Sequence, residues 1–256
     1  MKILLSPAKK LDFSEEKTFL VNTNISFSTK SIEIMNYLSP YSALELSDLM
    51  KVSKNIAILN KERNENWIFP FPQSKSKQAL LSFKGEVFQN MKINEFNKED
   101  FEYANNKLRI LSGLYGYLSP SDVIMPYRLE MGTKIKVGES KNLYEFWKNT
   151  LTNSLLKEIS TDGFLINLAS EEYFKVIDKS KINIPVITPV FKDFKNGKSR
   201  VVSFFAKRAR GEMCNFIIKN KDEVNVFYKI GSKPARDYWH GYDDFYEKLK
   251  KSPIKK

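Results

Sequence analysis

"LSGLYGYLSP", residues 111–120, is the least ordinary stretch of this 256-residue sequence, and it decides how the middle of the chain folds. Two glycines, Gly113 and Gly116, bracket a Leu-Tyr pair, and a Ser-Pro pair follows at Ser119. Glycine permits tight turns and lets a backbone come close to a ligand. The stretch is therefore either a plain turn between two packed elements or a turn whose exposed N–H groups contact a phosphate.

The residues on both sides of this stretch favour helices. Asn97 is a suitable N-cap, and Glu99 and Asp100 follow in the first turn, where the helix dipole favours negative charge. An apolar stripe then extends at helical spacing to Leu111, and a glycine is typical just after a helix end. Because Ser119 resembles a second helix start, we expect a helix–hairpin–helix-like element here.

The rest of the chain mixes strands and helices without a regular βαβ repeat. Helical spacing or a capping box indicates helices over residues 42–60, 80–91 and 146–159. Compact apolar runs predict strands at 2–6, 164–170 and 184–191, the last at a sheet edge because it holds two prolines. Asn-Gly at 196–197 predicts a hairpin. We expect a mixed α/β (α+β) fold, with a mixed sheet surrounded by helices in a single compact domain over residues 1–256.

Composition excludes several classes of protein. Hydrophobic residues make up 42% of the chain, which is enough for a core, and no apolar run approaches the roughly 20 residues of a membrane span. The N-terminus lacks the features of a signal peptide, so a cytoplasmic protein is expected. One cysteine and one histidine exclude an intramolecular disulfide and zinc sites built from several such ligands. We expect no metal, no cofactor and no membrane, and we favour binding over enzymatic catalysis.

Positive charge is concentrated near the C-terminus. The net charge is +12, and residues 192–256 carry 17 basic and 8 acidic side chains, a net of +9. Arginine is scarce, yet four of the seven arginines fall between residues 200 and 236. Arg is the better bidentate ligand of phosphate, so this distribution indicates an acidic partner for the C-terminal third.

The run "SFFAKRARGEMC", residues 203–214, carries the most informative cations. If a helix begins near Lys207, then Lys207, Arg208 and Arg210 lie at its positive end, where the helix dipole disfavours them. A bound phosphate would reverse that effect. The alternative is a solvated face with the charges spread apart. Cys214 is expected to be a small core residue rather than a reactive thiol.

Three further groups of residues are weaker candidates. Ser6 and Lys9 match S-x-x-K, which is common by chance. Glu171 and Glu172 are adjacent and diverge on any regular element, so they make a poor metal pair. Arg128 and Glu130 are interpreted as a local ion pair.

In several long motifs the chain resembles the YaaA family of bacterial peroxide stress proteins. The matching runs, in the family's order over roughly residues 1–218, are "ILLSPAK", "ALLSFKGEVF", "LRILSGLYGYLSPSDVIMPYRLEMG", "LYEFW", "INLASEEYF", "PVF" and "NGKSRVVSFFAKRARGEMCNFII". Residues 224–256 depart from the family's usual ending and form a divergent basic C-terminal tail.

The resemblance implies a peroxide stress protein that limits iron-driven oxidative damage and binds DNA through a basic cleft and a helix–hairpin–helix-like element. Carried onto this chain, it implies these DNA-binding residues: Lys9, Lys84, Gly113, Tyr115, Gly116, Arg128, Lys207, Arg208 and Arg210. The partner would be duplex or branched DNA, bound without strong sequence specificity by a monomer.

The alternative hypothesis is an enzyme that processes a nucleotide or another phosphate metabolite. Its pocket would lie at strand ends, a common location of ligand sites in open α/β sheets. The residues expected to line it are Ser6, Lys9, Tyr144, Asn167 and Ser170. No recognisable nucleophile–base pair accompanies them.

Overall fold

A computed structural model describes residues 1–14, 23–159, 163–191, 193–195, 198–200 and 202–221. The chain divides into two compact units that are interleaved along the sequence. Unit 1 comprises Met1–Gly85 and Asn97–Pro189, and unit 2 comprises Glu86–Phe96 and Val190–Lys256. The mixed α/β class is confirmed. The single domain over residues 1–256 stays a prediction, and the tail from residue 224 lies outside the described residues.

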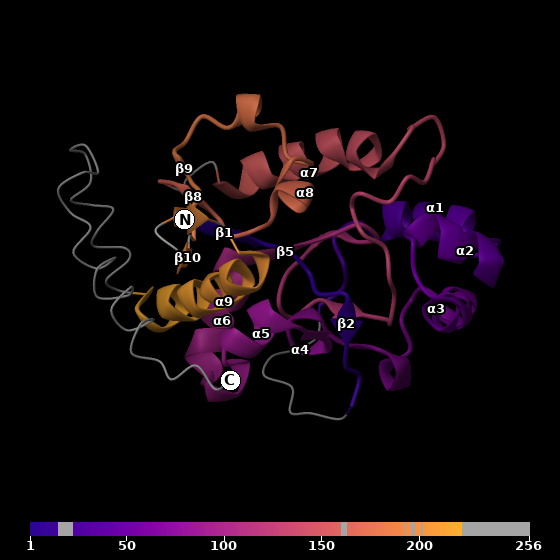
Figure 1. Cartoon of the computed structure of the whole chain (residues 1–256), viewed down its shortest axis with the longest axis horizontal. Helices are drawn as coiled ribbons and strands as arrows, with labels where there is room; N and C mark the ends of the chain where they lie inside the picture. The colour runs from indigo at the N-terminus through magenta and orange to yellow at the C-terminus, as the bar shows by residue number, and fades with distance from the viewer. Residues whose placement is uncertain (15–22, 160–162, 192, 196–197, 201, 222–256) are drawn as a thin grey trace. The chain divides into compact units, whose positions relative to one another are not determined.

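Unit 1 is built on a five-stranded sheet of order β6-β5-β1-β8-β9 (Figure 1). Its strands are β1 (Lys2–Leu5), β5 (Leu108–Ser112), β6 (Gly116–Leu118), β8 (Leu165–Asn167) and β9 (Val186–Ile187). β1 pairs in parallel with β5 and with β8, β8 pairs in parallel with β9, and β6 is antiparallel to β5. The predicted strands at 2–6 and 164–170 are confirmed, and β9 is an edge strand as its prolines indicate.

Short pairs of strands lie outside this sheet. In unit 1, β2 (Lys10–Leu11) pairs with β4 (Phe83–Lys84), and β3 (Lys77–Gln78) pairs with β7 (Val123–Ile124), both antiparallel. In unit 2, β10 (Asp193–Lys195) pairs with β11 (Lys198–Arg200). This pairing confirms the hairpin expected from Asn-Gly, whose two residues lie outside the described ranges.

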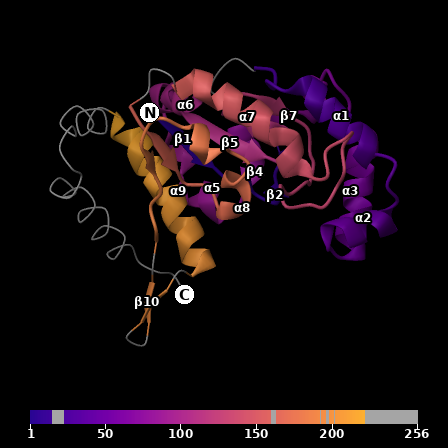
Figure 2. The ribbon, with the colours of Figure 1, turned by 90° about the horizontal axis from the view of Figure 1, so that it is seen from above.

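Helices α1, α2 and α3 lie side by side in unit 1 (Figures 1 and 2). The remaining helices of unit 1 lie, in chain order, between β1 and β9. The helices of unit 1 are α1 (Ser28–Leu38), α2 (Ala43–Met50), α3 (Lys54–Asn66), α4 (Ala79–Ser82), α6 (Lys98–Lys107), α7 (Leu143–Ile159) and α8 (Glu171–Phe174). Single 3-10 turns occur at Gln73–Lys75 and Lys179–Lys181.

Two expected helices are each divided. The region 42–60 forms α2 and α3, because Lys51 adopts a left-handed conformation with φ of 52° that ends α2. The Ser42 capping box at the start of α2 is present as predicted. Residues 80–91 form α4, β4 and α5 (Glu86–Asn90) instead of one helix, because Phe83 is extended with φ of −77° and ψ of 128°.

The helix–hairpin–helix prediction is wrong for residues 108–124. Helix α6 begins at its predicted N-cap, Asn97, which forms a capping box with Asp100, but the helix ends at Lys107, and strand β5 follows. Ser112 pairs with Gly116 across a β-hairpin. The helix expected at Ser119 is a turn, closed by a hydrogen bond from Asp122 N to Ser119 O, that leads into β7. The apolar stripe misled the prediction because a fully buried strand is also continuously apolar.

Unit 2 contains α5 and α9 (Ser203–Lys219), which pack closely together (Figures 1 and 2). A 3-10 turn at Ile93–Glu95 follows α5. Gly211 permits the close contact, since a Cβ there would lie 2.1 Å from Val87 O. Asn215 Nδ2 and Lys219 Nζ donate to the carbonyls of Met91 and Glu95. Helix α9 begins at Ser203. The sequence pattern indicated a start near Lys207, four residues later.

The core of unit 1 includes β1, β5, β6 and β8, most of whose residues are buried. Trp147, on α7, is fully buried and contributes the largest buried side chain. Among the residues that the structure describes, no helix combines the length and apolar character that a membrane crossing requires.

Candidate functional site

Polar side chains gather where the parallel strands β5, β1 and β8 end in unit 1. Ser6 follows β1 and Ser170 follows β8, and they are paired: Ser170 N donates to Ser6 Oγ at 2.8 Å, and Ser6 Oγ donates to Ser170 Oγ at 3.2 Å. At the end of β5, Ser112 Oγ lies 2.7 Å from Tyr127 OH. The carboxyl ends of parallel strands are the usual position of ligand sites in α/β sheets.

Asn167 and Tyr144 have different surroundings from the serine pair. Asn167 is buried, its Oδ1 accepts from Ala169 N at 3.0 Å, and its Nδ2 faces Thr188 Oγ1 at 3.4 Å. The Lys175 ammonium lies 4.1 Å from the centre of the Tyr144 ring, and burial raises the pKa of the Tyr144 hydroxyl. The structure thus brings Ser6 and Ser170 into contact, while Asn167 serves mainly to close its own turn.

A chain of charges begins at Lys9, three residues after Ser6. Lys9 Nζ lies 2.7 Å from Glu130 Oε2, and Arg128 Nη2 donates to Glu130 Oε1 at 2.9 Å. The ion pair expected between Arg128 and Glu130 is therefore present. The Arg128 side chain is only 15% exposed, whereas that of Lys9 is 63% exposed. One carboxylate thus balances two cations.

A second pair of cations adjoins Lys9. Lys10 in β2 lies directly opposite Lys84 in β4, and like charges in that position repel. Lys84 Nζ lies 3.4 Å from Asp12 Oδ2. Hydrogen bonds from Ser14, followed by the effect of Lys84, lower the pKa of Asp12 to about 2. We call Lys9, Lys10, Lys84 and Arg128 the basic edge; the ion pairs described above join Lys9 and Arg128 to Glu130, and Lys84 to Asp12.

The turn that contains Gly113 and Gly116 is buried. Gly113, Tyr115 and Gly116 are buried, so their backbone is not the exposed surface that a phosphate contact requires. A Cβ on Gly113 would lie 2.4 Å from Leu129 O, and Gly116 has a φ of 74° that favours glycine. These glycines permit close packing of the protein on itself.

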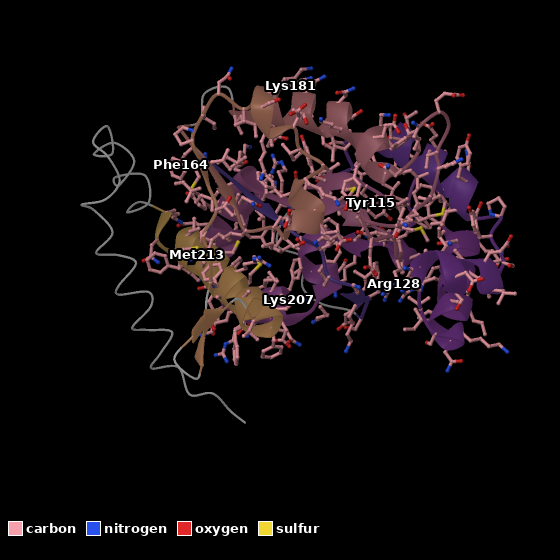
Figure 3. The ribbon with its side chains drawn as sticks, turned by 45° about the horizontal axis from the view of Figure 1, so that its top comes forward. Tyr115, Arg128, Phe164, Lys181, Lys207 and Met213 are labelled. Carbon is pink, nitrogen blue, oxygen red and sulfur yellow. The ribbon has the colours of Figure 1, made fainter. Side chains whose placement is uncertain are left out.

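Tyr115 lies among buried side chains of unit 1 (Figure 3). Its hydroxyl accepts from Trp67 Nε1 at 3.0 Å and donates to Met125 O at 3.2 Å. Burial raises the pKa of this hydroxyl. These internal hydrogen bonds occupy the hydroxyl in the free protein, and the DNA-binding role of Tyr115 stays a prediction.

The remaining predicted cations belong to helix α9 of unit 2, where Figure 3 labels Lys207 and, further along, Met213. Lys207 is exposed, Arg208 Nε donates to Glu212 Oε1 at 2.8 Å, and burial lowers the pKa of the half-buried Arg210. Because α9 begins at Ser203, these cations lie beyond its first turn, and the helix-dipole argument for a phosphate at its start no longer applies.

Sequence reasoning did not select Lys10, Asp12 or Arg63. Pairing of β2 with β4 makes Lys10 important, and two-residue strands leave no recognisable pattern in a sequence. Burial is the main cause of the lowered pKa of Arg63, and the nearby positive charge of Arg128 lowers that pKa further. The scarcity of arginine was the only signal available for Arg63. Within the described ranges, His, Cys, Asp and Glu side chains form no group able to hold a metal ion.

Comparison with known proteins identifies the family. The family model described as peroxide stress protein YaaA matches residues 1–231. A UPF0246 protein of Flavobacterium psychrophilum is 47% identical over 226 residues, which cover 88% of this chain and 89% of that protein. UPF0246 proteins of Clostridium botulinum and Aliivibrio fischeri are 46% and 44% identical, each over 86% of this chain and over 87% and 86% of their own length. The chain belongs to the YaaA family of peroxide stress proteins.

Proposed function

We propose that this member of the peroxide stress family binds DNA through its phosphates, without strong sequence specificity, and so limits iron-driven damage to DNA. The observation that carries the proposal is the basic edge, where Lys10 lies directly opposite Lys84 and where Lys9 and Arg128 share one carboxylate, Glu130. Such an excess of positive charge is favourable next to an anionic backbone and unfavourable without one.

The form of the basic edge suits phosphate contacts better than base recognition. Lys9 and Lys10 are exposed, and lysine interacts with phosphate as a flexible point charge. Contacts of this kind position a protein on DNA but carry no sequence information. Net positive charge on α9, with Lys207 exposed, supplies further contacts in unit 2.

The test is fluorescence anisotropy with labelled single-stranded, duplex and branched DNA over a salt series. Each phosphate contact contributes a slope of about −0.9 to the plot of log K against log salt for duplex DNA. Changing Lys9, Lys10 and Lys84 together to alanine is expected to weaken binding to every sequence and to reduce the slope by about 2–3. Lys207→Ala with Arg210→Ala tests the contribution of α9 separately.

The matched control changes three exposed lysines outside the basic edge, Lys54, Lys136 and Lys181, to alanine. It removes the same net charge, so it separates local contacts from general attraction. Equal affinities and equal salt slopes in the two triple variants would contradict binding at the basic edge. Peroxide survival of cells that carry each variant then connects DNA binding to the stress response.

The second candidate function is the processing of a nucleotide or phosphate metabolite at the strand ends. The contact between the Ser6 and Ser170 hydroxyls favours it, because two hydroxyls meet at the carboxyl edge of the sheet. The test is turnover of nucleotides by the purified protein and by Ser6→Ala. Turnover that the substitution abolishes supports the enzyme, whereas turnover unaffected by the substitution excludes Ser6 from it.

A further inference from the structure

A cavity of about 440 Å³ in unit 1 lies beside the C-terminal turns of α3. Its volume falls within the range of small-molecule sites. Leu11, Phe13 and Met125 belong to an apolar part of its wall, and Arg63 and Lys75 bring positive charge to it. An apolar wall combined with a few charged groups is the usual composition of a ligand pocket. We call this cavity the Arg63 pocket.

The Arg63 guanidinium is placed at an energetic cost in the free protein. Burial is the larger cause of its lowered pKa, and the positive charge of Arg128 is the next. The Arg63 guanidinium forms one weak polar contact with the described residues, a 3.3 Å hydrogen bond that Nη1 donates to Asn60 Oδ1. Among the residues that the structure describes, no carboxylate forms an ion pair with Arg63. A partly desolvated cation of this kind is stabilised when an anion enters the pocket.

Arg128 strengthens this argument. One of its nitrogens, Nη2, is bound to Glu130, while its Nε is buried without a hydrogen-bond partner among the described residues. The charge of Arg128 is thus close enough to lower the pKa of Arg63. Arg128 has an unused donor, and Arg63 has no ion pair among the described residues. The C-terminal turn of α3 favours a cation at Arg63, but that effect does not require the group to be buried beside a second arginine.

The other polar groups of the pocket define the ligand more closely. Asn66, Ser74 and Ser76 offer amide and hydroxyl groups, and Glu62 offers a hydrogen-bond acceptor. An acceptor in the same pocket disfavours a bare inorganic anion and favours a ligand that also carries donors, such as sugar hydroxyls or an exocyclic amine. The apolar wall around Phe13 suits a flat ring.

We propose that the Arg63 pocket binds one nucleotide unit, with its phosphate on Arg63 and Lys75 and its base on the apolar wall. The nucleotide is either a free mononucleotide or an unpaired nucleotide of a DNA strand, since both present the same groups. Lys9, Lys10 and Lys84 do not line this pocket, so substitutions of those three residues test the proposed DNA contacts without removing a residue of the pocket wall.

The first measurement is isothermal titration calorimetry of the full chain with AMP, adenosine and inorganic phosphate. We expect AMP to bind at least about tenfold more tightly than adenosine or phosphate alone, because only AMP engages both parts of the pocket. Phosphate binding as tight as AMP binding would contradict the nucleotide assignment.

The second measurement distinguishes the two sources of the nucleotide. Duplex DNA with one unpaired adenosine is compared with the fully paired duplex by fluorescence anisotropy. A preference for the unpaired base that is lost in Arg63→Gln assigns the pocket to DNA. AMP binding that is lost in the same variant, without such a preference, assigns it to the free nucleotide. Both affinities unchanged in Arg63→Gln would overturn the proposal.

Arg63→Gln is expected to fold, because it removes a half-buried charge that forms no ion pair with a described carboxylate and that only the nearby charge of Glu62 favours, so its melting temperature is expected to stay close to that of the wild type. Arg63→Lys keeps the charge but loses the bidentate geometry, and it is expected to bind the ligand more weakly than the wild type. Lys54→Gln, on the same helix but outside the pocket, is the matched control and is expected to retain wild-type affinity. Loss of ligand binding in Lys54→Gln equal to that in Arg63→Gln would contradict the assignment.

Discussion

The indole Nε1 of Trp147 donates a hydrogen bond of 2.9 Å to the carbonyl oxygen of Gly113, and both residues are buried. Helix α7 is thereby bonded to the turn between β5 and β6. We expect Trp147→Phe, which keeps most of the apolar volume, to lower the free energy of unfolding by about 1–3 kcal/mol, because the carbonyl is left buried without its partner. Urea unfolding of the two proteins measures the difference, and an unchanged midpoint would contradict the importance of this bond.

The two glycines of the same turn are expected to be essential for stability rather than for DNA contact. A Cβ on Gly113 would overlap Leu129 O at 2.4 Å, and one on Gly116 would meet Leu151 and Trp147 within 3 Å. Each alanine substitution is expected to cost about 1–3 kcal/mol of stability through overpacking. Gly85→Ala, where the nearest contact is Ala8 Cβ at 3.2 Å, is the milder control. A folded Gly116→Ala protein is expected to retain DNA affinity; a specific loss would restore the contact role.

Local sequence signals predicted the ends of several elements but not the hairpin between them. The capping boxes at Ser42 and Asn97 are visible in sequence because the bonded residues are three apart. The switch from α6 to β5 at Leu108 was missed because β5 is made by pairing with β1, about a hundred residues earlier in the chain. The local spacing of apolar residues does not reveal a strand partner that is distant in the sequence.

The candidate site, like the fold, could be predicted from the sequence only in part. Lys9, Lys84 and Arg128 were selected as cations, but the carboxylates that bind Lys9 and Lys84, which are Glu130 and Asp12, come from distant parts of the chain. Sequence reasoning did connect Arg128 with Glu130, which are two residues apart. It had no means of placing Arg63 near Arg128, because that proximity depends on the packing of α3 in unit 1.

Glu158 is expected to support stability at neutral pH and to lose that role in acid. It lies 2.6 Å from Arg109 and 3.0 Å from Lys2, and it accepts a short hydrogen bond from Tyr117 OH. Burial opposes ionisation of Glu158, but the charge of Arg109 and the surrounding hydrogen bonds outweigh it and lower the pKa of the carboxyl. A lowered pKa in the folded state stabilises the protein above the unfolded pKa of about 4.3, and the effect disappears as the pH falls below it.

The variant Glu158→Gln tests this assignment. It is expected to cost about 2–3 kcal/mol at pH 7, less than the loss at a fully buried pair, because Glu158 is 22% exposed. Its unfolding free energy is also expected to fall less steeply than that of the wild type between about pH 5 and pH 3. Parallel pH profiles of the two proteins would show that Glu158 does not titrate as described.

Cys214 is expected to be an inert core residue. It is fully buried on α9, and burial raises the pKa of its thiol to about 12. An aromatic disulfide reagent at pH 8 is expected to react with it only after unfolding, since the thiolate is the reactive form. Cys214→Ala is expected to leave peroxide protection intact, and loss of protection in a folded Cys214→Ala protein would indicate a role for the thiol.

The raised pKa of Cys214 also predicts a pH dependence. The thiol ionises near pH 8.5 in the unfolded chain but stays protonated in the folded one, so stability falls as the pH rises above 8.5. Between about pH 7.5 and pH 9.5 the wild type is expected to lose about 1.4 kcal/mol more than Cys214→Ala. Guanidinium unfolding of both proteins at the two pH values measures this difference, and equal losses would contradict it.

Because Lys10 and Lys84 repel each other, replacing Lys10 is expected to raise the stability of the protein and to weaken its binding of DNA. Lys10→Glu replaces two like charges that lie directly opposite each other with an attractive pair, and it is expected to stabilise the protein by about 0.2–1 kcal/mol. The same change places a negative charge on the basic edge and is expected to weaken DNA binding more than Lys54→Glu, which changes the net charge equally at an exposed position of α3. Thermal unfolding and DNA anisotropy of the two variants test both parts. A Lys10→Glu protein that is stabilised but binds DNA as well as Lys54→Glu would show that the repulsion is real and that DNA is not the anion it accommodates.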